Sequence, residues 1–131
     1  MTDHDRIKLV GVDPRLPDLV AKIFTAMAAL GFWMEVTDGL RTTAQQQALY
    51  AQGRTTPGPI VTNADGVTTL SNHQGGLAVD CCFLVNGAPS WDARLPWKAY
   101  GACAEALGLK WGGDWTSLVD LPHLELPKGP A

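Results

Sequence analysis

Glycine and proline take up a large share of this chain, with 14 glycines and 9 prolines among 131 residues. Both residue types favour turns and interrupt helices and strands, so loops must account for much of the chain. A chain of this length has room for one compact domain with a hydrophobic core, and for little else. We therefore expect residues 1–131 to form a single domain of short helices and strands, with no separate second domain.

The composition excludes several classes of protein. Hydrophobic residues make up 46% of the chain, as in ordinary globular proteins. The net charge is −3, and without a dense run of Lys and Arg we expect no nucleic-acid binding. No apolar stretch approaches the roughly 18–20 residues of a membrane span, and the polar residues 1–8 lack the apolar core of a signal peptide. We expect synthesis in the cytoplasm and no membrane insertion.

Apolar spacing, with glycine or proline at the ends of segments, predicts three helices and four short strands. The helices are expected over residues 17–30, 43–52 and 96–107, and the strands over 32–36, 77–85, 109–111 and 123–126. Thr43 is the expected cap of the second helix. Residues 54–70 are predicted to form a long loop, which in compact domains often borders a functional site. Since helices and strands do not alternate regularly, we expect an α+β fold with a small antiparallel sheet.

Two of the three histidines are placed where they could meet an aspartate. His73 ends the long loop, and Asp80 follows seven residues later on the longest predicted strand, after Gly75 and Gly76, which allow a sharp turn. His123 opens the last strand. Two imidazoles and one carboxylate can hold zinc and leave its fourth position open, as catalytic rather than structural zinc sites do.

Two further residues could serve the chemistry of such a site. Asp120 precedes His123 by three residues and could act as a general base if the intervening Leu-Pro pair bends the chain. Arg41 could pair with a substrate carboxylate or a developing oxyanion. Each has an ordinary alternative, because an aspartate before Leu-Pro is often a turn residue and a lone arginine is often a solvated charge. Spacing alone therefore leaves both interpretations open.

Four segments resemble one family of zinc peptidases. Residues 71–80 (SNHQGGLAVD) match the S-x-H-x-x-G-x-A-x-D signature of the D-alanyl-D-alanine carboxypeptidase and L-alanyl-D-glutamate endopeptidase family at every specified position. Residues 120–125 (DLPHLE) resemble its second signature, in which an acidic residue precedes the last zinc ligand by three. Residues 39–54 and 111–115 resemble its arginine block and a segment of its phage endolysin branch. The family includes vancomycin-resistance dipeptidases and is distantly related to the Hedgehog signalling domain.

The resemblance implies a fold, a cofactor and a set of site residues. The fold would be Hedgehog-like and DD-peptidase-like, a small antiparallel sheet with about three helices. One zinc ion would be held by His73, Asp80 and His123, with Asp120 as the catalytic base. Glu125, two residues beyond His123, would share its face of a strand and could orient it.

The resemblance also implies groups that bind the substrate. Arg41 becomes a catalytic and substrate-binding group near the scissile bond, Ser71 becomes a second substrate-binding group, and Gln46 is a candidate for supporting them. Leu40 and Leu124 stand where relatives usually have an aromatic residue and phenylalanine. These departures change no zinc ligand.

Three functions are compatible with these residues. The first is a zinc-dependent peptidoglycan peptidase that cuts between L-alanine and D-glutamate in stem peptides, favoured by an aspartate at position 120 and by the absence of an export signal. The second is a D-Ala-D-Ala carboxypeptidase or dipeptidase. The third is a non-catalytic wall-binding zinc domain, against which Asp120 and Arg41 argue. For the first, we expect a monomer, without a separate cell-wall-binding domain, that reaches the wall after release from the cytoplasm.

Overall fold

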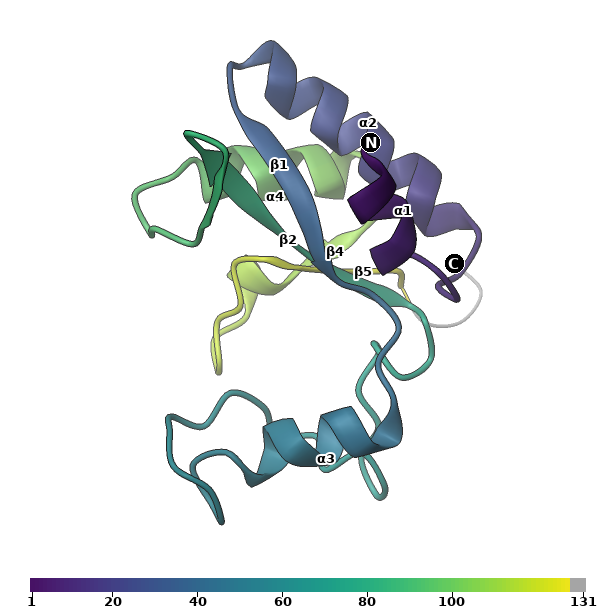
Figure 1. The fold of residues 1–131 in the computed structure, drawn as a ribbon, viewed down its shortest axis with the longest axis vertical. Helices are drawn as coiled ribbons and strands as arrows, with labels where there is room; N and C mark the ends of the chain where they lie inside the picture. The colour runs from purple at the N-terminus through teal and green to yellow at the C-terminus, as the bar shows by residue number, and fades with distance from the viewer. Residues whose placement is uncertain (128–131) are drawn as a thin grey trace.

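The computed structural model describes residues 1–127, which contain four α-helices, one 3₁₀ turn and five strands (Figure 1). The helices are α1 (Asp3–Lys8), α2 (Arg15–Ala29), α3 (Thr43–Ala51) and α4 (Trp97–Ala106), and the 3₁₀ turn is η1 (Gly112–Asp114). The strands are β1 (Trp33–Asp38), β2 (Ala78–Val85), β3 (Ala88–Ser90), β4 (Lys110–Trp111) and β5 (His123–Glu125). The predicted α+β class is confirmed. None of these helices has the length and apolar character that crossing a bilayer requires.

The strands form one antiparallel sheet around β2. The order is β1-β2-β5-β4, and β3 pairs with the later part of β2. Asn86 and Gly87 join β2 to β3 with positive φ angles of 52° and 78°, as the Asn-Gly pair predicts for a tight hairpin. In the pairing of β2 with β5, Asp80 lies directly opposite His123.

The two faces of the sheet have different surroundings. Helices α2 and α4 lie together behind the sheet in Figure 1, and Val79, Cys81 and Phe83 of β2 belong to the core on that side. Because side chains alternate along a strand, Asp80 is on the opposite face. All three cysteines are free, and the Cys81 thiol is buried in the core.

The observed fold contains two elements that the sequence did not predict, α1 and β3, and helix α3 has a different cap. The polar N-terminal segment forms α1, in which the buried Asp5 accepts hydrogen bonds from Thr2 N (3.1 Å) and from Val36 N of the edge strand β1 (2.8 Å). Helix α3 is capped by Thr42 and not by Thr43, since the Thr42 hydroxyl accepts from Gln45 N. The contact of Asp5 with β1 spans 31 residues, so no local pattern could reveal it.

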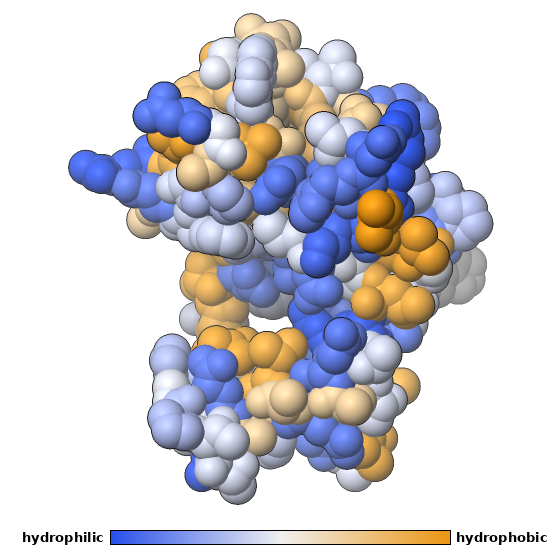
Figure 2. Space-filling view, in the orientation of Figure 1, coloured by the Kyte–Doolittle hydropathy of each residue, from blue (hydrophilic) through white to orange (hydrophobic). Residues whose placement is uncertain are grey.

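Helix α3 and the loop that follows it stand apart from the rest of the domain. A cleft of about 520 Å³ separates them from the sheet and from the segment before β5. Figure 2 shows the hollow between the two parts, with apolar surface on its lower wall. The lower wall includes Leu49, Val61 and Leu70, and the upper wall includes Trp115 and Leu118.

Trp111 connects α4 with the turn that precedes β5. A Cβ atom on Gly101 of α4 would lie 2.3 Å from two carbons of the Trp111 ring, so only glycine allows the indole to pack there. A Cβ atom on Gly113, in η1, would likewise lie only 2.1 Å from a carbon of the Trp111 ring. The indole Nε1 donates to the Leu121 carbonyl at 2.7 Å. The packing of α4 thus helps to place the residues around His123.

Replacing Gly101 with alanine tests this packing. In a helix interior, alanine normally raises the free energy of unfolding by up to about 1 kcal/mol relative to glycine. Overpacking a core lowers the free energy of unfolding by about 1–3 kcal/mol. We expect Gly101→Ala to lower the free energy of unfolding by about 1–2 kcal/mol in urea denaturation. The exposed neighbouring change Ala102→Gly is the control, which should cost no more than about 1 kcal/mol. A Gly101→Ala variant more stable than the wild type would contradict the proposed role of Gly101.

Candidate metal centre and substrate cleft

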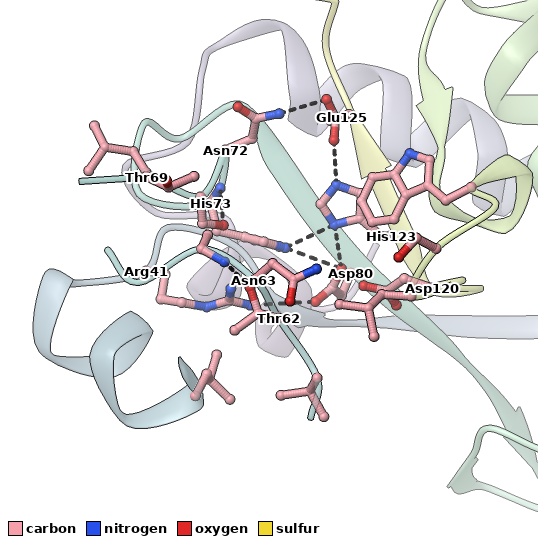
Figure 3. A pocket seen from close by; sticks show the side chains of 18 residues that line it. Arg41, Thr62, Asn63, Thr69, Asn72, His73, Asp80, Asp120, His123 and Glu125 are labelled. Atoms are coloured by element: carbon pink, nitrogen blue, oxygen red, sulfur yellow. Dashed lines mark hydrogen bonds and ion pairs between the residues drawn. The ribbon is translucent and has the colours of Figure 1, made fainter. Parts of the chain in front are cut away.

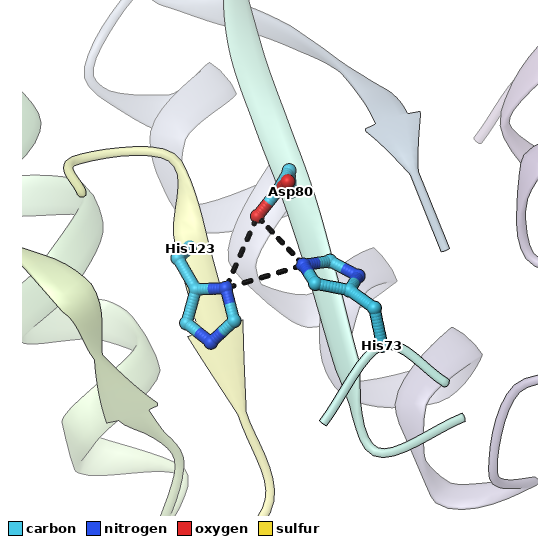
Figure 4. Close-up of side chains that lie close together, drawn as sticks. All are labelled: His73, Asp80 and His123. Carbon is cyan, nitrogen blue, oxygen red and sulfur yellow. Dashed lines mark hydrogen bonds and ion pairs between the residues drawn. The ribbon is translucent and has the colours of Figure 1, made fainter. Parts of the chain in front are cut away.

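The structure brings the three predicted zinc ligands together. His73 Nε2 lies 3.2 Å and His123 Nδ1 3.3 Å from Asp80 Oδ1, and the two nitrogens are 3.2 Å apart (Figure 4). His73 comes from the loop before β2, Asp80 from β2 and His123 from β5. Both histidines are buried. Three potential ligand atoms therefore form a nearly equilateral triangle.

The hydrogen bonds of the two imidazoles determine which nitrogen faces this triangle with a lone pair. His73 Nδ1 donates to the Gly39 carbonyl at 2.9 Å, because a carbonyl can only accept. His123 Nε2 donates to the Glu125 carboxylate at 2.8 Å, the role that the spacing of these two residues suggests. In neutral imidazole the other nitrogen then carries the lone pair. Both free lone pairs are directed toward Asp80.

The electrostatics of the triangle favour a bound cation. Burial raises the pKa of Asp80, but the two imidazoles beside it lower that pKa by more than burial raises it. The pKa of Asp80 therefore lies well below its ordinary value. Burial lowers the pKa of His123, but the carboxylates of Asp80 and Glu125 outweigh it and raise that pKa to about 9. The buried Asp80 Oδ1 has no hydrogen-bond donor among the described residues. Positive charge at this point would therefore be stabilised.

The donor set fits zinc in both chemistry and size. Imidazole nitrogen and carboxylate oxygen are ordinary zinc ligands. In a tetrahedral site with bonds of about 2.0–2.1 Å, the ligand atoms are about 3.3–3.4 Å apart. The observed separations of 3.2–3.3 Å agree with this spacing. His73, Asp80 and His123 could thus hold one zinc ion without rearrangement.

Asp120 lies in the same cleft as these ligands (Figure 3). The bend that its role requires is present, since His123 N donates to the Asp120 carbonyl at 3.2 Å across the turn. Burial raises the pKa of the Asp120 carboxyl, and Asp80 raises it further, while His123, His73 and Arg41 act in the opposite direction. A carboxylate with a raised pKa beside a metal site is suited to accepting a proton.

The turn from residue 120 to residue 123 is held from the core side. The buried Tyr100 hydroxyl donates to the Pro122 carbonyl at 2.7 Å, and Trp111 binds the carbonyl before it. Asp120 N donates to the Gly112 carbonyl at 3.0 Å. A side chain at Gly112 would clash with the Asp120 backbone, at 2.4 Å. Aromatic residues of α4 and β4 thus determine where Asp120 and His123 lie.

Arg41 is more deeply embedded in the protein than a simple substrate-binding arginine. Its side chain is 11% exposed and makes hydrogen bonds with Asp38 through Nε and Nη2. Nη1 donates to Gln46 Oε1 at 2.8 Å, and Nη2 lies 3.7 Å from Asp80 Oδ2. Arg41 also lines the cleft. It can therefore support the metal site electrostatically as well as face a substrate.

The remaining predicted residues take different positions. The Ser71 hydroxyl lines the cleft and accepts from His73 N at 3.2 Å. Gln46 is fully buried, where it binds Arg41 and donates to the Ala64 carbonyl at 2.9 Å, so it supports the wall of the cleft from behind. The third histidine, His4, lies 3.1 Å from the Val36 carbonyl on β1, outside this cluster.

Sequence reasoning missed three residues that contact the site. Asp38 at the end of β1 binds Arg41, and no local motif marks it. Asn72 donates to Glu125 Oε2 at 2.6 Å from an unspecified position of the first signature. The Trp115 ring lies against His123, with centroids 4.8 Å apart. Only the last carried a signal, its place in the segment 111–115 that resembles the endolysin branch.

The sequence is similar to one protein-family model and to two named peptidases. Residues 65–126 match the family model described as D-alanyl-D-alanine carboxypeptidase. The chain is 37% identical over 110 residues to the peptidoglycan L-alanyl-D-glutamate endopeptidase CwlK of Bacillus subtilis (strain 168). The aligned region covers 77% of this chain and 65% of CwlK. It is 38% identical over 60 residues to the L-alanyl-D-glutamate peptidase of Listeria phage A118, over 44% of this chain and 21% of that protein. The chain thus spans less than two thirds of either relative.

Solved structures share the fold. The L-Ala D-Glu endopeptidase ChiX of Serratia marcescens superposes with a TM-score of 0.65 and 29% identity, over 97% of this chain and 89% of that one. The vancomycin resistance D,D-pentapeptidase VanY, solved in complex with Zn(II), gives a TM-score of 0.63 at 22% identity, over 88% and 72% of the two chains. The DD-peptidase-like fold inferred from the motifs is confirmed, and these matches agree with the family resemblance of the two signatures.

Replacing Arg41 with lysine tests how far this residue serves the fold. Lysine keeps the charge but cannot contact Asp38 and Gln46 together, so one charge-assisted hydrogen bond is lost. We expect the free energy of unfolding, measured in urea with a chelator present, to fall by about 1.5–3 kcal/mol. Arg94→Lys is the control, because that side chain is 91% exposed and should change stability by about 0.5 kcal/mol at most. If Arg41→Lys matched this control yet lowered kcat/KM, Arg41 would act mainly on the substrate.

Proposed function

We propose that this chain, whose residues 65–126 match the D-alanyl-D-alanine carboxypeptidase family, is a zinc-dependent peptidase of bacterial peptidoglycan. Its target would be the bond between L-alanine and D-glutamate in the stem peptide. The observation that carries the proposal is the triangle of His73, Asp80 and His123 with Asp120 beside it in an open cleft. The names of CwlK, ChiX and the phage peptidase support the choice of bond.

The ligand triangle supports zinc as the metal, because its donor atoms and their separations suit that ion. The Zn(II) complex of VanY is a further support. When bound, zinc would polarise the scissile carbonyl and lower the pKa of water. His73 and His123 would present lone pairs from the nitrogens that their hydrogen bonds leave free, and Asp80 would contribute its charge.

Asp120 would move the proton in this reaction. Its carboxylate faces the cleft next to the ligands, and its raised pKa favours acceptance of a proton from the attacking water. The same group can then protonate the leaving amine, because a carboxyl with a raised pKa is also a usable acid at neutral pH. Ser71 and Arg41 line the cleft and would contact the peptide on either side of the bond, with Gln46 holding Arg41 in place.

A second candidate is a D-Ala-D-Ala carboxypeptidase, which the description of the matching family favours. It would use the same metal ligands and the same base, and would differ only in which part of the stem peptide the cleft accepts. A wall-binding domain without activity is less compatible with the site, because metal binding alone does not require a half-buried carboxyl such as Asp120 beside the ligands.

Digestion of purified peptidoglycan by the zinc-loaded protein tests the proposal. We expect new L-alanine carboxyl ends and new D-glutamate amino ends, identified by mass spectrometry, and their loss after chelation or in His123→Ala. Release of free D-alanine would instead support the carboxypeptidase. Intact peptidoglycan after treatment with protein that contains one zinc per chain would rule out both enzymes.

Asp120→Asn separates the base from the metal site. Asparagine has nearly the same shape but cannot accept the water proton, and general-base groups typically contribute about 10²–10⁴-fold in rate. We expect kcat to fall by about 10²-fold or more, with zinc content by elemental analysis unchanged. Wild-type turnover at full zinc occupancy would show that another group is the base.

A further inference from the structure

We infer that Asn72 is a positioning residue for the metal site, which braces the two segments that carry the histidines against each other through Glu125. The inference rests on the zinc site of the proposed function and adds a residue to it. Asn72 Nδ2 donates to Glu125 Oε2 at 2.6 Å, and Glu125 Oε1 accepts from His123 Nε2 at 2.8 Å (Figure 3). The Glu125 carboxylate thus connects Asn72, in the first signature, to His123, the proposed metal ligand in the second signature.

Glu125 needs this support to orient His123. The pairing of β5 with β2 places the Glu125 backbone opposite Ala78, but it leaves the rotatable bonds of the side chain free. Glu125 uses one oxygen for His123 and the other for Asn72, so the plane of its carboxylate is fixed from both sides. The side chain is 13% exposed, so little water competes for these oxygens. A fixed carboxylate plane determines how the imidazole ring of His123 is turned.

Asn72 can brace the site because its own backbone is anchored. Its carbonyl accepts from Leu77 N at 3.0 Å, and the carbonyl of the next residue, His73, accepts from Arg41 N at 3.0 Å. The short segment that supplies His73 therefore also holds the partner of His123. The two ligands lie 50 residues apart in sequence, and this side-chain contact links their segments outside the strand pairing. Mutation of a residue that holds a metal ligand in place typically weakens metal affinity by about 10–100-fold.

The test is zinc affinity, measured by competition with a chromophoric chelator. We expect Asn72→Ala to raise the Kd for zinc about tenfold, and Asn72→Asp to raise it more, because a second carboxylate would then face Glu125. The matched control is Asn63→Ala, which removes an asparagine of the same cleft whose side-chain oxygen accepts from Arg54 at 3.3 Å. That control should bind zinc as the wild type does.

A double-mutant cycle shows whether Asn72 acts through Glu125. Glu125→Ala should weaken zinc binding by itself, and adding Asn72→Ala to it should cause no further loss, because the two residues form one chain of contacts. The absorption spectrum of the cobalt-substituted protein provides a second readout. Asn72→Ala should alter the bands that report ligand geometry, which a purely structural change away from the ligands would leave in place.

Two results would overturn the inference. One is a zinc affinity for Asn72→Ala equal to that of Asn63→Ala, and the other is full additivity with Glu125→Ala. Neither measurement needs a peptide substrate. If the variants show the expected zinc affinities but the wild type leaves peptidoglycan intact, the proposed activity is wrong and the role of Asn72 stands. If the wild type is active but Asn72→Ala binds zinc normally, the proposed activity stands and the role of Asn72 is wrong.

Discussion

The pairing of β2 with β5 is the interaction on which the candidate site depends. It sets Asp80 directly opposite His123, and side chains in such antiparallel pairs have Cβ atoms only about 4.5–5.5 Å apart. The register is enforced from the other face, where Val79 and Leu124 are fully buried in the core. A slip of β5 by one residue would turn Leu124 away from the core and turn His123 into it. The hydrophobic effect thereby holds a polar site in place.

A second layer of contacts controls the polar groups around the ligands. Each imidazole donates one N–H to an acceptor in the protein, the Gly39 carbonyl for His73 and Glu125 for His123. In the neutral imidazoles these bonds leave the lone pair on the other nitrogen, so they determine which nitrogen a metal would meet. Tyr100 holds the adjacent turn from inside the core. Buried polar groups are costly when unpaired, which explains why nearly every one here has a partner and why Asp80 Oδ1 stands out among the described residues.

The cleft is built by joining a loop-rich wall to this rigid base. Gln46 of α3 binds the Ala64 carbonyl of the wall and also Arg41, whose guanidinium binds Asp38 at the end of β1. The wall, the arginine and the sheet are therefore one connected network. A change in any of them would be felt at Asp80, which lies 3.7 Å from Arg41. The proposed substrate contacts and the metal site are thus coupled by ordinary hydrogen bonds.

Local periodicity in the sequence was sufficient for the α+β class. The resemblance of two segments to known signatures was sufficient to predict that His73, Asp80 and His123 would meet, with Asp120 beside them. The sequence did not reveal α1, the strand β3, or the contact of Asn72 with Glu125. The contacts of Asp5 with Val36 and of Asn72 with Glu125 join groups that are distant along the chain and become neighbours only when the sheet forms. Strand β3 pairs locally with β2, but its residues Ala88–Ser90 include no β-branched or aromatic side chain that would mark a strand. Residue type decided which groups could bind a metal, and tertiary packing decided which nitrogen of each imidazole faces it.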